Sequence, residues 1–231
     1  MQLLQQVLAV GAVILCLHAS ARALVRTDYK LQDTQWCFVH AIVNVVIASC
    51  TWDIVVDLST HFDMPERKFP ILLAMGLHLY HVLFFELSAA DRFHHLMFLP
   101  TIGLPGACFD WRNIGNVQLF FMCGLPGAIL YALVVVQRLF PSVRPCAREP
   151  LVSALVNVTL RCPGVLYANA WLFWAWSRSH ITVPALFVAL QCAIAPANAM
   201  FYSYKALLRA VPRSHVASSS DTAKDSVRKA V

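Results

Sequence analysis

The chain has 231 residues, of which 59% are hydrophobic and only 13% charged, and its mean hydropathy is +0.63. Soluble domains are about 45–50% apolar and about 25% charged, so this composition excludes an ordinary soluble domain. The net charge of +6 does not indicate nucleic-acid binding, because the basic residues stand between apolar runs and in the tail. The composition therefore predicts an all-α integral membrane protein.

Seven apolar runs follow one another, each near the length of about 20 residues that a membrane-spanning helix needs. They cover residues 3–21, 35–58, 69–87, 93–109, 117–140, 151–176 and 181–208. The fourth run is short and contains Pro100 and Pro105. This order predicts about seven transmembrane helices. We expect a first helix and loop over 1–34, a membrane domain over 35–210, and a tail over 211–231.

The distribution of basic residues predicts the orientation. Lys and Arg gather in the odd-numbered connections and the tail, whereas the even-numbered ones hold only Arg67, Lys68, Arg112 and Arg178. Positive charge marks the cytosolic side, so the N-terminus is predicted to be luminal or extracellular and the C-terminus cytosolic. The first run has small-residue sites typical of signal-peptide cleavage. The charge distribution instead favours a retained helix.

The tail is rich in Ser, Ala, Lys and Asp, a composition typical of disorder. Its last residues are Arg228, Lys229, Ala230 and Val231, which resemble an endoplasmic-reticulum retrieval signal. We therefore favour the endoplasmic reticulum as the location.

Pro-Gly steps interrupt three of the runs, at residues 105–106, 126–127 and 163–164. Breaks of this kind survive in lipid only where protein or water satisfies the freed backbone. They predict either kinked helices around a cavity or ordinary packing kinks.

Ionisable residues in apolar runs are costly in a bilayer and need a reason. The main cluster spans the third and fourth runs and consists of His78, His81, Glu86, Asp91, His94 and His95. Asp91 precedes the histidine pair by three and four residues, so its carboxylate could orient an imidazole for general acid–base chemistry. The same residues could bind a lipid headgroup or a metal. Alternatively, Asp91 caps a helix and the pair faces headgroups.

Two smaller polar groups lie elsewhere. Asp53 and Asp57 share one face near the end of the second run, where we expect a membrane interface. Arg161 lies one turn from Asn157 in the sixth run. Its guanidinium is expected either to pair with a carboxylate such as that of Glu86 or to extend toward the interface.

The motifs His78-Leu-Tyr-His81 and Asp91-Arg-Phe-His94-His95 resemble the centre of the TLC-domain family. That family includes ceramide synthases, the translocon-associated TRAM proteins and small TLC-domain proteins. Segments 160–167 and 198–205 are similar to its Arg-x-Pro segment and to the end of its last helix. The resemblance covers about residues 35–209 and makes 35–210 a TLC-like domain.

The resemblance implies helices around a lipid cavity and, as in ceramide synthases, acyl transfer from acyl-CoA at His94 and His95, with Asp91 as an upstream acid. It gives supporting or lipid-binding roles to His78, His81, Glu86 and Arg161. Neither a metal nor another cofactor is expected, with acyl-CoA as the co-substrate if the protein is an enzyme. Segment 124–131 lacks the further Asp residues of ceramide synthases. The chain therefore resembles more closely the small members linked to membrane phospholipid composition.

The function expected from these features is lipid homeostasis, with a membrane lipid as the partner and no nucleic acid. A non-enzymatic trafficking factor is one alternative, favoured by the retrieval-like tail. A zinc-dependent hydrolase of the alkaline-ceramidase type is another, although the last run lacks the paired His of such enzymes.

Overall fold

The computed structural model describes residues 2–24, 32–140 and 149–211. Within these residues the chain is all helix, without strands. The elements are α1 (Gln2–Leu24), α2 (Gln32–Val56), α3 (Leu58–His61), α4 (Phe69–Phe84), α5 (Ala89–Phe98), η2 (Leu99–Gly103), α6 (Leu104–Cys108), α7 (Ile114–Leu119), η3 (Phe120–Gly124), α8 (Leu125–Leu139), α9 (Glu149–Leu155), η4 (Val156–Arg161), α10 (Cys162–Ser177) and α11 (Ala185–Ala210). The three η segments are π-helical turns that join the α-helices beside them into continuous rods.

Five of the seven predicted spans are helices long and apolar enough to cross a membrane. They are Gln5–Ala23, Thr34–Val56, Ile114–Leu139, Glu149–Ser177 and Ala185–Ala210. Helix α4 is apolar but has only 16 residues, or about 24 Å, which is shorter than a hydrocarbon core of about 30 Å. That the α5–η2–α6 rod crosses the membrane also remains a prediction. The lipid cavity remains a prediction as well. The described chain is thus a helical protein compatible with multiple membrane passes.

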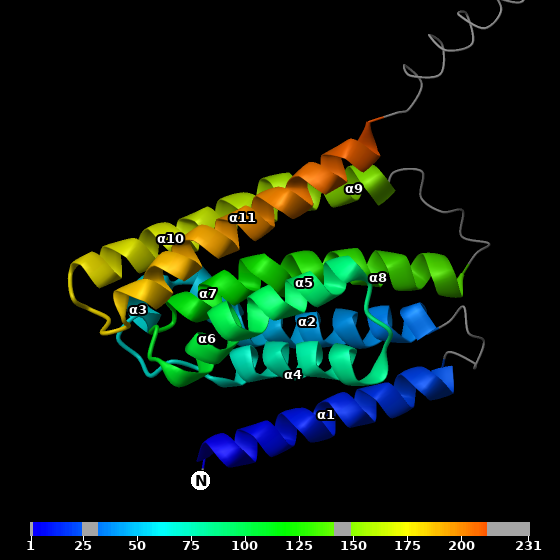
Figure 1. Cartoon of the computed structure of the whole chain (residues 1–231), viewed down its shortest axis with the longest axis horizontal. Helices are drawn as coiled ribbons and strands as arrows, with labels where there is room; N and C mark the ends of the chain where they lie inside the picture. Colours follow the sequence, from blue (N-terminus) through cyan, green and yellow to red (C-terminus); the bar gives the residue numbers. More distant parts are fainter. Residues whose placement is uncertain (1, 25–31, 141–148, 212–231) are drawn as a thin grey trace, which may run out of the picture.

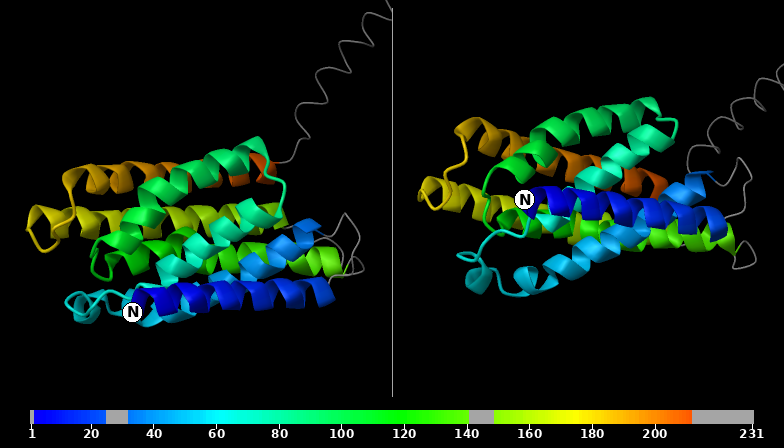
Figure 2. Two further views of the ribbon diagram at one scale, coloured as in Figure 1. Left: turned by 60° about the horizontal axis from the view of Figure 1, so that its bottom comes forward. Right: turned by 90° about the horizontal axis from the view of Figure 1, so that it is seen from below.

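The helices run back and forth along one long axis (Figure 1). Connections 57–68, 109–113 and 178–184 meet at one end of the bundle, which also carries α3 and is called here the α3 end. Helix α1 lies at one edge beside α4, and α10 and α11 lie together at the opposite edge (Figure 2). Helix α2 packs against α1, α4, α7 and α8. The predicted tail, with its retrieval-like residues, lies outside the described residues from 212 onward.

Apolar side chains cover both the inside and the outside of the bundle. Val39, Val43 and Leu73 are fully buried among the central helices, whereas Leu83 is 74% exposed and Leu96 71% exposed. Large exposed apolar surfaces are unfavourable in water but match a lipid environment. The packing therefore agrees with the composition.

Each predicted Pro-Gly step directly follows one of the π-helical turns. Pro105, Pro126 and Pro163 are each the second residue of the α-helix that resumes after η2, η3 and η4. Proline has no N–H and its ring clashes with the carbonyl four residues earlier. A wider π-helical turn relieves that conflict and lets the rod continue. The predicted fourth helix is therefore continuous through both of its prolines.

The glycines of these steps lie where neighbouring helices come closest. A Cβ atom at Gly106 would lie 2.9 Å from Ile71 of α4, and one at Gly164 would overlap the ring of Phe121 in η3. A Cβ at Gly127 would overlap Asn44 of α2. The glycines of the Pro-Gly steps thus allow neighbouring helices to pack closely, which agrees with the packing role that the sequence predicted.

The predicted acidic pair, Asp53 and Asp57, forms hydrogen bonds at the α3 end. Asp53 accepts two hydrogen bonds from Arg67, at 2.8 and 2.6 Å. Asp57 caps α3 and accepts from the backbone N–H of Thr60 at 3.1 Å and from two hydroxyls. Those hydrogen bonds lower the pKa of Asp57 to about 2. Both carboxylates therefore organise the connection between α2 and α4.

Candidate functional site

Four of the predicted site histidines form a cluster between α4 and α5. Residues 85–88 turn the chain, so that the two helices lie side by side and their imidazoles meet. Nε2 of His78 lies 3.2 Å from Nε2 of His94, and Nδ1 of His81 lies 2.9 Å from Nε2 of His95. His78, His81 and His95 are buried, and His94 is partly exposed. The structure thus brings together the four histidines that the sequence selected.

Matching donors to acceptors assigns the proton positions in the neutral His78–His94 pair. Nδ1 of His78 lies 2.7 Å from the carbonyl oxygen of Ala74, so it must carry a proton and donate. Nε2 of neutral His78 is then an acceptor, to which Nε2–H of His94 donates. Neutral His94 is left with an unprotonated Nδ1, and no hydrogen bond to that nitrogen is found within the described residues.

The proton position in the neutral His81–His95 pair is assigned in the same way. Nδ1 of His95 is buried and has no hydrogen-bond partner within the described chain. A buried unsatisfied N–H is costly, so the proton of neutral His95 belongs on Nε2, which donates to His81. Nδ1 of His95 therefore also keeps a free lone pair. An unprotonated ring nitrogen is what a general base requires.

Aromatic and polar residues of α2 and α8 extend the cluster. Trp36 stacks on His81 with ring centroids 3.7 Å apart, and His40 stacks on Tyr131 of α8 at 3.9 Å. Asn44 lies 3.0 Å from Nδ1 of His40. The sequence reasoning missed these residues. Trp36, His40 and Asn44 recur every four positions, a helical stripe that could have indicated a shared face.

Arg161 lies on the other side of the cluster, across Tyr202 of α11. Its guanidinium carbon is 5.4 Å from the centre of the Tyr202 ring, and that ring is 6.2 Å from the ring of His94. Nη1 of Arg161 donates to Asn157, as their spacing of one turn allows. The side chain of Asn157 in turn donates to the carbonyl oxygen of Ser153 at 2.8 Å. Arg161 thus belongs to the cluster region.

The two predicted carboxylates take other positions. Asp91 accepts from the Ser88 hydroxyl at 2.6 Å and completes a capping box at the start of α5. It acts on His94 and His95 only through space, so of the two roles predicted for Asp91 the structure shows helix capping and not a hydrogen bond to an imidazole. Glu86 is exposed in the turn, and the predicted pair with Arg161 does not form. Asp91 instead caps the helix that begins after the tight turn.

Metal binding requires several ligands that converge on one point. Within the described ranges, no group of three or more His, Cys, Asp or Glu side chains is arranged to hold a metal ion. The histidines instead meet in pairs, ring nitrogen to ring nitrogen.

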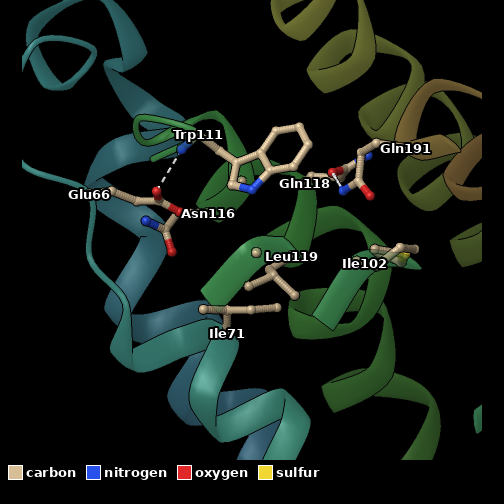
Figure 3. Close-up of a pocket in the computed structure, with 11 residues that line it drawn as sticks. Glu66, Ile71, Ile102, Trp111, Asn116, Gln118, Leu119 and Gln191 are labelled. Atoms are coloured by element: carbon tan, nitrogen blue, oxygen red, sulfur yellow. Dashed lines mark hydrogen bonds between the residues drawn. The ribbon is translucent and has the colours of Figure 1, made fainter. Parts of the chain in front are cut away.

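A second polar site lies at the α3 end and was not predicted. The Glu66 carboxylate is buried, with its side chain only 5% exposed. It accepts from the backbone N–H of Trp111 at 2.8 Å (Figure 3) and also from Lys68 at 2.7 Å. Burial raises the pKa of Glu66 to about 7, against the opposing effects of Lys68 and the Trp111 N–H. In the sequence, Glu66 stands in a short connection directly before two basic residues, and nothing there indicates burial.

Glu66 lines a small cavity between the connections and α7. Its volume of about 20 Å³ fits roughly one water molecule. Gln118 and Gln191 line its other side and are hydrogen-bonded to each other (Figure 3). Gln118 also donates to Asn169 at 2.8 Å, which joins α7, α10 and α11. This polar network fixes helices at the α3 end.

Comparison with known proteins adds no relative to these observations. No family model, curated protein or solved structure matches the chain.

Proposed function

We propose that the chain is a TLC-like multi-pass membrane protein of lipid homeostasis, which binds a lipid or acyl chain at the histidine cluster. The observation that carries this proposal is the pairing of four imidazoles from α4 and α5, with lone pairs left free at Nδ1 of His94 and His95. The exposed apolar surface of the surrounding helices supports a lipid as the ligand.

Acyl transfer is the chemistry that this arrangement supports best. Nδ1 of His94 can accept a proton from an acceptor amine or hydroxyl as that group attacks the thioester of an acyl-CoA. The proton moves to the imidazole, and the leaving thiolate later takes a proton. His78 fixes the orientation of His94, because its own proton is held by the carbonyl oxygen of Ala74. Asp91 can favour the resulting imidazolium through space.

Replacement of both His94 and His95 by Ala is expected to abolish the effect of the protein on cellular lipid composition. If acyl transfer is the activity, its rate in membranes supplied with acyl-CoA should fall by about 10²–10⁴-fold, as for the loss of a general base. Lipid profiling of cells that express each variant measures the first effect. His180→Ala is the matched control, because His180 is exposed at the α3 end.

The trafficking alternative makes the opposite prediction. Under that alternative, deletion of residues 228–231 abolishes function and the double His variant keeps it. A lipid profile that is unchanged by the double variant would therefore overturn the proposed function. The predicted orientation, with a luminal or extracellular N-terminus in the endoplasmic reticulum, belongs to the same proposal and is testable by tag accessibility.

A further inference from the structure

Arg161 is a buried charge in the middle of a long apolar helix. It is 8% exposed and lies 12 residues from the start and 16 from the end of the candidate span Glu149–Ser177. These separations correspond to about 18 and 24 Å along the helix, too far for the side chain to reach either end of the helix. A guanidinium at this depth needs partners within the protein or a ligand.

The partners that the chain supplies are all neutral. Asn157 accepts one hydrogen bond from Nη1, and the Tyr202 ring lies under the guanidinium. Nε is buried without a hydrogen-bond partner in the described part of the chain. Tyr131, Cys123 and His94 also lie near enough to interact electrostatically with the guanidinium.

The carboxylates of the described residues do not neutralise this charge. Those that form ion pairs, Asp53, Glu66 and Asp110, pair with basic side chains near the α3 end. Asp91 is held by Ser88 in its capping box. A guanidinium carries five N–H donors in a planar fork, which matches the two oxygens of a carboxylate or phosphate. The positive charge is therefore uncompensated within the described protein and is suited to an oxyanion.

We propose that Arg161 binds the oxyanion of an amphipathic lipid, a carboxylate or a phosphate, beside His94. This inference rests on the proposed lipid-binding function and assigns the chemical class of the ligand. The Tyr202 ring lies near both groups, 5.4 Å from the guanidinium carbon and 6.2 Å from the His94 ring, so a polar head at Arg161 would place the neighbouring ligand atoms near His94. The π-helical turn η4 ends at Arg161, and such turns frequently occur at functional sites.

The test compares lipids that differ only in charge, with the full-length protein purified in an uncharged detergent. Oleate is compared with oleyl alcohol, and lysophosphatidate with monooleoylglycerol, each by titration of tryptophan fluorescence. We expect one anionic lipid to bind at least tenfold more tightly than its neutral counterpart. The pair that shows this preference identifies carboxylate or phosphate. Competition by inorganic phosphate at similar concentrations would instead identify a free phosphate as the source of the oxyanion.

Variants locate the preference at Arg161. Arg161→Gln should bind the anionic and neutral lipids equally, whereas Arg161→Lys should keep part of the preference. In delipidated protein, Arg161→Met should not lower the melting temperature, because it removes an uncompensated charge. A purely structural arginine would show the opposite result, with a lower melting temperature.

The outcomes separate this inference from the proposed function. Equal binding of charged and neutral lipids by the unmodified protein overturns the oxyanion site alone, whether or not the variants fold. A preference that survives in Arg161→Gln also overturns it. If none of the four lipids binds, the proposed lipid-binding function is overturned as well.

Discussion

Gly164→Ala is expected to lower the free energy of unfolding by about 2–3 kcal/mol, the upper part of the range for overpacked interiors. The new methyl group would overlap the Phe121 ring and lie 2.7 Å from the Phe121 Cβ. Because Cβ itself is too close, rotation of the ring alone cannot relieve the clash. The backbones of α10 and η3 must therefore move apart. The measurement is unfolding in mixed micelles at increasing SDS fraction, followed by tryptophan fluorescence.

Gly11→Ala is the matched control in the same assay. A Cβ at Gly11 in α1 meets nothing within 4 Å. The substitution removes the backbone entropy cost of glycine in a helix and should stabilise the protein by about 0.5–1 kcal/mol. The same change from Gly to Ala should thus lower the stability of the protein at position 164 and raise it at position 11. Equal stability of the Gly164 variant and the unmodified protein would show that this helix contact is not tight.

Glu66 is expected to make the protein less stable as the pH rises from 5 to 8. Burial raises its pKa in the folded protein from the ordinary 4.5 to about 7, while Lys68 lowers it and Asp110 raises it. Between these values the folded state binds a proton that the unfolded state does not, so stability falls as pH increases. At about 1.4 kcal/mol for each pH unit between the two values, the loss is about 3 kcal/mol.

The Glu66→Gln variant isolates this effect from the titration of the histidines. Its amide can still accept from the Trp111 N–H but does not titrate in this range. The quantity to measure is the difference in unfolding free energy between the two proteins, from pH 5 to pH 8 in uncharged detergent. A difference that is constant across this range would show that Glu66 does not bind a proton on folding. Asp57 contributes outside this window, since its stabilising effect is lost only as pH falls toward 2.

The site could be predicted only in part. His78, His81, His94 and His95 were selected by type and spacing, and the structure brings all four together. For Asp91 the sequence left two roles open, and the structure shows the helix cap, because sequence spacing does not tell whether a side chain faces its own helix cap or a neighbouring residue. Trp36, His40, Tyr131 and Tyr202 join the cluster from distant segments. Their contribution depends on which faces of α2, α8 and α11 turn inward.

The sequence by itself determined that the chain is helical and suited to a membrane, since composition and run length depend on transfer to lipid and not on contacts between helices. It also located the three Pro-Gly steps. Only the tertiary structure decided that Arg161 has no carboxylate partner among the described residues and that Glu66 is buried. Both outcomes depend on which side chains meet across helices, and hydrophobic periodicity does not specify this in a chain that is apolar on every face.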